Sequence, residues 1–207
     1  MTQQLTFIIY AFISIFAIVN PISGVMAFIS MTANMSKVDK LYVARRSVVI
    51  ATIIAIIFSI TGDLILSLFN IKVDHLRVAG GILLFLVALD MLFARTTRES
   101  ITTEELKYAS QRENISVFPI AMPLLTGPGA ITTIIVLSGT LDQKLIVIGV
   151  ILLTFLITFL IFRFSDYFNK VVGMSGMLVM TRLMGLFLGA IAVNFIFIGI
   201  KNIFNLA

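Results

Sequence analysis

The chain has 207 residues, of which 59% are hydrophobic and 12% are charged, and its mean hydropathy is +1.11. Soluble domains average about 45–50% apolar and about 25% charged residues, so the composition excludes a soluble protein and indicates an all-α polytopic membrane protein. The net charge of +5 comes from Lys and Arg dispersed among apolar runs, without a basic tract, which argues against nucleic acid as a partner.

The first expected membrane span covers about residues 5–31, within a run from 1 to 36 that has no charged side chain. The run has no basic start and no Ala-x-Ala-like site after it, so we expect a retained span rather than a cleaved signal. Near its middle, NPISG at 20–24 combines helix breakers with polar side chains that lipid disfavours, so the helix should be interrupted there. The residues concerned are Asn20, Pro21, Ser23 and Gly24.

The second and third expected spans are separated by a short connection. Residues 34–46 supply four basic residues and are expected to form a loop before the second span, at about 47–69. A connection at 70–76 follows, and the third span runs from about residue 77 to 94.

Each of these two spans contains one acid, Asp63 or Asp90, near its end. Acids inside membrane spans indicate function by default, so both are candidates for proton coupling. An acid near a span end can instead reach the headgroups or pair with a base, as Asp90 with Arg95. Both interpretations stay open for each acid.

The fourth span, 117–140, follows the one long polar segment of the chain. Residues 96–116 are expected to be a solvated cytoplasmic loop, and a short surface helix over 103–112 fits their composition. The span itself contains VFPIAMPLLTGPGAITT at 117–133, with three prolines and a Gly-Pro-Gly sequence. We therefore expect unwound backbone at Thr126–Gly129, which membranes tolerate only where protein or water surrounds it.

The last two spans complete the chain. The fifth is expected at about 145–165, a turn at 173–176, and the sixth from Arg182 to Lys201 with Asn194 in its middle. Six spans account for nearly the whole sequence, so we expect a single transmembrane domain over residues 1–207.

The distribution of Lys and Arg predicts the orientation. The connections after spans one, three and five carry 11 basic residues, and the opposite side carries 4. By the positive-inside rule the first set is cytoplasmic, which predicts a cell-membrane protein with both termini outside.

A weak internal repeat relates the two halves, about 1–95 and 117–207. Four pairs of similar residues lie 104 to 107 positions apart. They are Pro21 and Pro128, Arg77 and Arg182, Gly80 and Gly185, and Asp90 and Asn194. Because each half has three spans, the second half must be inverted relative to the first. Inverted repeats with discontinuous first helices are typical of secondary transporters, which bind substrate near the midplane.

The two expected breaks could bind a small zwitterion. Free N–H groups and the positive end of a restarting half-helix suit a carboxylate, and unpaired carbonyls suit an ammonium group. The candidate substrate-binding residues are Asn20, Pro21, Ser23, Gly24, Thr126, Gly127, Pro128, Gly129, Thr132, Thr133 and Asn194. For Thr132 and Thr133, hydrogen bonds to the carbonyl four residues earlier are an equal alternative. Gly80 and Gly185 are most simply close-packing sites between helices.

Four stretches resemble the MarC family of integral membrane proteins, and together they extend over the expected spans. They are NPISG at 20–24, LRVAGGILLFLVALDML at 76–92, VFPIAMPLLTGPGAITT at 117–133 and TRLMGLFLGAIAVNFI at 181–196. That family includes archaeal small neutral amino acid transporters (SnatA) and is related more distantly to the LysE exporters. The resemblance implies a six-span transporter of glycine-like or alanine-like substrates driven by protons. It carries the family's broken-helix motifs onto Asn20, Pro21 and Gly24, and onto Thr126, Gly127, Pro128 and Gly129.

The functional expectation is a secondary amino acid transporter, with uptake and export both open. A LysE-like exporter of amino acids or metabolites and a passive channel are the alternatives. An enzyme is disfavoured because the chain has no cysteine, and its only histidine, His75, lies outside the expected spans. We expect no catalytic residue, metal site or cofactor. The expected partners are a zwitterionic amino acid, H+ and the bilayer, and homo-oligomer formation stays open.

Overall fold

The computed structural model describes residues 2–93 and 112–205, and every regular element in those ranges is helical. The elements are α1 (Thr2–Val19), α2 (Pro21–Met31), α3 (Lys37–Leu68), α4 (Val73–Leu92), α6 (Arg112–Ile115), η1 (Ser116–Leu125), α7 (Pro128–Leu137), α8 (Leu141–Arg163) and α9 (Ser165–Ile203). The expected polar loop, its surface helix and Arg95 fall on residues 94–111, which lie outside the described residues, apart from the loop's last residues at 112–116. The all-α expectation is confirmed.

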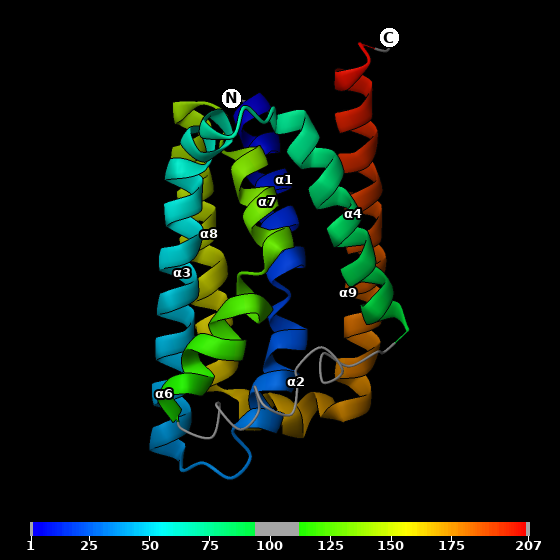
Figure 1. The fold of residues 1–207 in the computed structure, drawn as a ribbon. Helices are drawn as coiled ribbons and strands as arrows, with labels where there is room; N and C mark the ends of the chain where they lie inside the picture. Colours follow the sequence, from blue (N-terminus) through cyan, green and yellow to red (C-terminus); the bar gives the residue numbers. More distant parts are fainter. Residues whose placement is uncertain (1, 94–111, 206–207) are drawn as a thin grey trace.

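The helices form a membrane-spanning bundle. Five helical stretches are long and apolar enough to cross a membrane, and η1 with α7 forms a sixth candidate span that is bent by 55°. In Figure 1 the chain passes down through α1 and α2, up through α3, down through α4, up through η1 and α7, down through α8 and up through α9. Both termini therefore lie at the same end of the bundle.

Two helices begin much earlier than expected. α3 starts at Lys37, because the Ser36 hydroxyl accepts a hydrogen bond from the Asp39 N–H (3.2 Å) and caps the helix. The expected basic loop at 34–46 is therefore wrong, since its basic residues lie on the first turns of α3. α9 starts at Ser165, and the expected turn at 173–176 is a single kink at Gly173, where φ is +67°.

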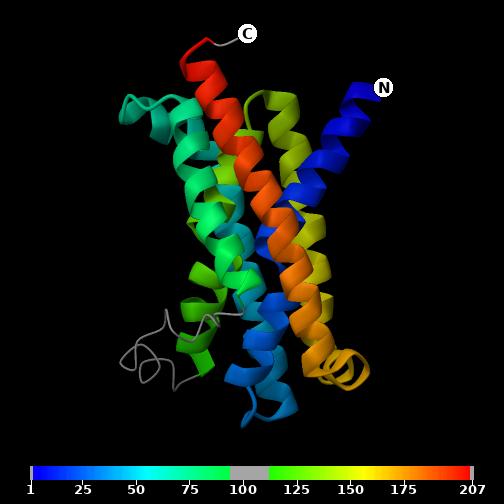
Figure 2. The ribbon, with the colours of Figure 1, turned by 90° about the vertical axis from the view of Figure 1, so that its right-hand side faces the viewer.

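The bundle has two hydrophobic cores. The larger one joins α1, α2, α3, α6, η1, α7, α8 and the first part of α9, and includes the stacked rings of Phe28 and Phe162, whose centroids are 4.7 Å apart. The smaller one lies between α4 and α9, around Leu84, Leu188 and Phe195. Figures 1 and 2 show α4 and α9 side by side along one flank of the molecule. α4 and the later part of α9 thus form a distinct pair packed against the remaining helices.

Candidate functional site

The first candidate span, Gln3–Met31, departs from helical backbone geometry at one residue, Asn20. Its backbone is left-handed (φ 46°, ψ 67°), a conformation that asparagine tolerates better than most residues. The Asn20 N–H donates to the Phe16 carbonyl (2.9 Å), and its carbonyl accepts from the Gly24 N–H (3.0 Å). Pro21 occupies the first turn of α2, where a missing N–H costs nothing. The break is therefore narrower than the expected 20–24.

The fourth span is interrupted over a longer stretch. Within η1 the backbone is extended at Phe118 and Met122, each of which precedes a proline and so disfavours helical angles; both X–Pro bonds are cis. Thr126 (φ −127°, ψ 59°) and Gly127 (φ −76°, ψ 175°) then separate η1 from α7. Pro128 and Gly129 already form the first turn of α7, so the unwound segment is shorter than Thr126–Gly129.

The two breaks lie close together. A methyl group placed on Gly24 would be 3.3 Å from the Phe162 ring and 3.5 Å from the Leu125 side chain. The start of α2 therefore meets the end of η1, with α8 behind them. Figure 1 shows both interruptions at a similar height in the bundle.

The polar groups of the first break are satisfied by the protein itself. Asn20 Nδ2 donates to Ser23 Oγ (2.6 Å) and to the Met91 sulfur (3.5 Å), while Asn20 Oδ1 accepts from the Ser23 N–H (3.3 Å). Ser23 Oγ donates to Thr181 Oγ1 (3.0 Å), which links α2 to α9. Thr181 was not among the sequence candidates, although it adjoins Arg182 in a stretch that the family resemblance includes. Asn20 and Ser23 thus mainly hold the break in place.

The second break leaves backbone groups unpaired. Buried Thr126 donates its hydroxyl to the Ala51 carbonyl (3.2 Å), which fixes the break to α3. No side chain caps α7, and within the described residues the N–H groups of Gly129 and Ala130 make no hydrogen bond. These two groups sit at the positive end of the helix and can donate hydrogen bonds to an anionic group.

Buried hydroxyls without a partner lie on three neighbouring helices. In the described part of the chain, the hydroxyls of Ser14 (α1), Thr133 (α7) and Thr154 (α8) make no hydrogen bond. Neither Thr132 nor Thr133 donates a hydrogen bond to the carbonyl four residues earlier, so the expected alternative of such bonds is wrong. Only one of the threonine rotamers allowed in a helix brings the hydroxyl to that carbonyl. Buried polar atoms are normally bonded, so these hydroxyls are candidate ligand contacts.

Helix α4 contacts both breaks. Asn20 of the first break reaches Met91, and a methyl group on Gly129 would lie 2.5 Å from Leu84 Cδ2. At Gly80 the approach is closer still, since a Cβ there would overlap the Thr132 side chain of α7. One rigid helix therefore packs against both interruptions.

A cleft of about 340 Å³ opens at the end of the bundle where the termini lie. Its walls come from α1, α4, α7 and α9 and from Gln143 near the start of α8. Asn194 lines this cleft together with Arg77, whose guanidinium donates to Asp74 (2.7 Å). Neither break contributes to the lining, so the structure separates Asn194 from the other candidate site residues.

The two acids have different surroundings. Asp63 is 2.7 Å from the Lys144 ammonium, so the alternative of pairing with a nearby base holds for it. Asp90 is exposed and has no ion pair or hydrogen bond within residues 2–93 and 112–205; its suggested partner, Arg95, lies outside those ranges. In the same ranges, no group of three or more His, Asp or Glu side chains could hold a metal ion.

We expect the Asp63→Asn variant to lose less than about 1 kcal/mol of unfolding free energy, because the Asp63 carboxylate is 43% exposed and exposed ion pairs contribute little. Thermal unfolding in detergent, compared with Lys144→Gln, measures this. The two single variants should have similar effects. A loss of several kcal/mol would instead indicate a desolvated pair with a larger role.

Comparisons with known proteins agree with the sequence motifs. The chain matches the family model of the MarC family integral membrane proteins over residues 5–204. A UPF0056 membrane protein of Aquifex aeolicus is 39% identical over 196 residues, 93% of this chain and 92% of the relative. YvbG of Bacillus subtilis is 36% identical over 207 residues, 98% of each chain, and YhcE of Escherichia coli is 36% identical over 196 residues, 93% and 91%. No solved structure matches.

Proposed function

Because the chain belongs to the MarC family of integral membrane proteins, we propose that it is a proton-coupled secondary transporter of small neutral amino acids such as glycine and alanine. The observation that carries the proposal is the uncapped start of α7, which lies beside the interrupted first span deep in the bundle. Discontinuous helices that meet in this way are where secondary transporters bind substrate.

The substrate carboxylate binds to the free N–H groups of Gly129 and Ala130, which the positive end of α7 reinforces. The Thr126 carbonyl accepts no backbone hydrogen bond in the described chain and is the nearest acceptor for the substrate ammonium group. Leu125 and Phe162 lie close to Gly24, so little space is left for a side chain. These contacts favour a compact zwitterion.

Reciprocal packing between α4 and α9 supports the inverted repeat. A Cβ on Gly81 would lie 2.9 Å from the Ala192 carbonyl oxygen, and a Cβ on Gly185 would lie 3.1 Å from the Ala88 carbonyl oxygen. Gly81 and Gly185 are 104 positions apart, as are Ala88 and Ala192. Each contact is therefore the image of the other, as a two-fold relation between inverted halves requires.

The same repeat relates residues at opposite ends of the bundle. Asn194 and Arg77 line the cleft at the end that carries the termini, and their repeat counterparts are Asp90 and Arg182. We assign the cleft to the outer side, because Lys and Arg concentrate at the opposite end. Asp90 then lies toward the cytoplasmic side. Since Asp63 is paired with Lys144, Asp90 is the better candidate for the coupling carboxylate.

The experiment that tests the proposal is a counterflow assay in proteoliposomes across the twenty amino acids. Saturable exchange of glycine and alanine supports it. Non-saturable flux would indicate a passive channel, and exchange restricted to large or cationic substrates would indicate a LysE-like exporter.

We expect Gly129→Ala to lower glycine counterflow by about 10- to 200-fold, the usual effect of one carbon misplaced in a tight site. The added methyl would be 2.5 Å from Leu84 Cδ2, at the residue whose N–H binds the substrate. Gly149→Ala is the matched control, because no atom lies within 4 Å of its added Cβ. Equal counterflow by the two variants would mean that the first turn of α7 is not part of the substrate site.

A further inference from the structure

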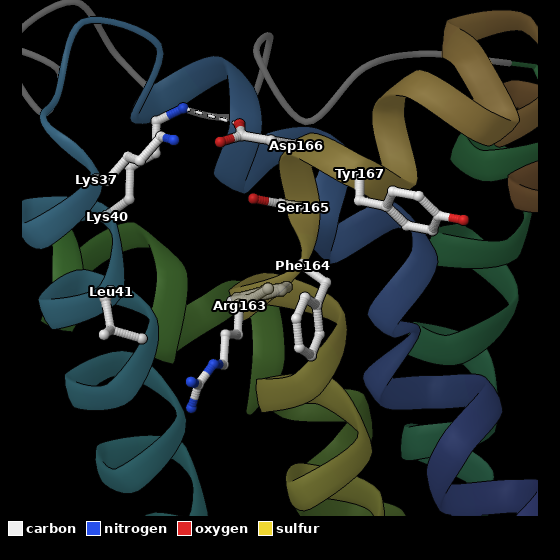
Figure 3. A pocket seen from close by; sticks show the side chains of 9 residues that line it. Lys37, Lys40, Leu41, Arg163, Phe164, Ser165, Asp166 and Tyr167 are labelled. Carbon is white, nitrogen blue, oxygen red and sulfur yellow. Dashed lines mark hydrogen bonds and ion pairs between the residues drawn. The ribbon is translucent and has the colours of Figure 1, made fainter.

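A second pocket, of about 270 Å³, opens at the opposite end of the bundle, where α3 begins and α8 passes into α9. Figure 3 shows Lys37 and Lys40 at one end of this pocket and the Arg163 guanidinium at the other. The side chains of Leu41 and Phe164 form an apolar part of the pocket wall. The pocket shares no lining residue with the cleft, whereas Phe162, which lines the pocket, also contacts Gly24 of the first break.

The pocket carries uncompensated positive charge. Lys40 Nζ lies 3.0 Å from Asp166 Oδ1, so one cation is paired. Lys37 and Arg163 have no carboxylate partner among the described residues, and the Arg163 guanidinium lies 5.9 Å from the centre of the Phe164 ring. Two positive charges are therefore available to bind an anion that enters the pocket.

Ser165 adds a hydrogen-bond donor to the pocket. The residue is only 3% exposed, yet its hydroxyl makes no hydrogen bond in the part of the chain that the structure describes. Figure 3 shows that hydroxyl pointing into the pocket, between the lysines and Arg163. The hydroxyl lines the pocket and has no partner in the described chain, so it can donate a hydrogen bond to an acceptor bound there.

The pocket lies at the depth of lipid headgroups. The apolar helix α8 ends at Arg163, and the first part of α9 lies across this end of the bundle (Figure 1). Phe164 and Tyr167 are 56% and 69% exposed, as expected for aromatic side chains that anchor a protein at the membrane interface. A ligand with a charged group and an apolar chain would therefore find charged side chains for the first and an apolar surface for the second.

We propose that this pocket binds the phosphate of an anionic phospholipid. The phosphate lies between Lys37 and Arg163 and accepts a hydrogen bond from Ser165, and the acyl chains run along Leu41 and the outer surface of α3. Basic pockets between spans on the cytoplasmic side are suited to anionic headgroups. The assignment does not depend on which solute the protein transports.

The test measures phosphatidylglycerol binding to the full-length protein in neutral detergent by native mass spectrometry. We expect the double variant Lys37→Gln/Arg163→Gln to bind about 25-fold more weakly, because each basic residue near an anionic lipid contributes about fivefold. Ser165→Ala changes no charge and should weaken binding about tenfold through the lost hydrogen bond to phosphate. It also keeps the test valid if the double variant folds poorly.

The matched control is Lys170→Gln/Lys201→Gln, which removes the same charge from exposed residues outside the pocket. It should change phosphatidylglycerol binding by less than about twofold. Equal weakening by both double variants would mean diffuse attraction and would overturn the proposal. Full competition by millimolar inorganic phosphate would also overturn it, by identifying a soluble anion as the ligand, whereas phosphatidylcholine should neither bind nor compete.

Discussion

Replacing Gly80 by alanine is expected to lower the free energy of unfolding by about 1–3 kcal/mol and to suppress transport. The added Cβ would overlap the Thr132 side chain, so α4 and α7 must separate. The same helix α4 holds Leu84 against Gly129 and Met91 against Asn20, so a displacement at Gly80 would disturb both breaks. Thermal unfolding in detergent and glycine counterflow measure the two effects.

Gly149→Ala makes the same substitution in α8 where the space is open, so it should be neutral or stabilise by up to about 1 kcal/mol. Adding Thr132→Gly to Gly80→Ala removes all three atoms that the new methyl would meet. The double variant should therefore be less destabilised than the sum of the single variants, as expected for residues in contact. If Gly80→Ala proves as stable as Gly149→Ala, the close α4–α7 contact does not exist in the membrane.

Composition was enough to predict an all-helical membrane protein, and the breaker residues marked Asn20 and Thr126, where the backbone departs from helical angles. Helix ends were harder, because hydropathy marks where a chain is apolar and not where its helix starts. α3 extends ten residues beyond its expected apolar span, and α9 includes residues expected to lie in a turn. The Ser36-x-x-Asp39 capping pattern was a usable signal for the true start of α3.

The candidate site was predicted only as far as local sequence determines it. The left-handed Asn20 and the extended residues before Pro119 and Pro123 follow from the residue types themselves. The partners that hold the breaks do not, because Thr181 lies 158 positions from Ser23, and Ala51 lies 75 positions from Thr126. Asn194 shows the same limit, since its midspan position suggested the substrate site and its place in the fold is the cleft.

The Asp90→Asn variant is expected to exchange glycine at the normal rate but to lose accumulation driven by a pH gradient. A gradient of two pH units is worth about 2.7 kcal/mol per proton, which supports accumulation of about 100-fold for one-to-one coupling. An amide cannot carry the proton, so the variant should only equilibrate its substrate. Uptake of labelled glycine into proteoliposomes with a pH gradient of either sign, and into pH-matched proteoliposomes, separates accumulation from exchange.

Asp63→Asn is the matched control, because it makes the same chemical change at the other acid near a span end, where Lys144 already compensates the charge. It should keep accumulation near that of the unmodified protein. The repeat strengthens the contrast: the position equivalent to Asp90 is Asn194, so one half carries a group that can hold a proton and the other carries its neutral counterpart. Accumulation that persists in Asp90→Asn but fails in Asp63→Asn would reverse the assignment. Accumulation that persists in both would mean that the driving ion binds elsewhere.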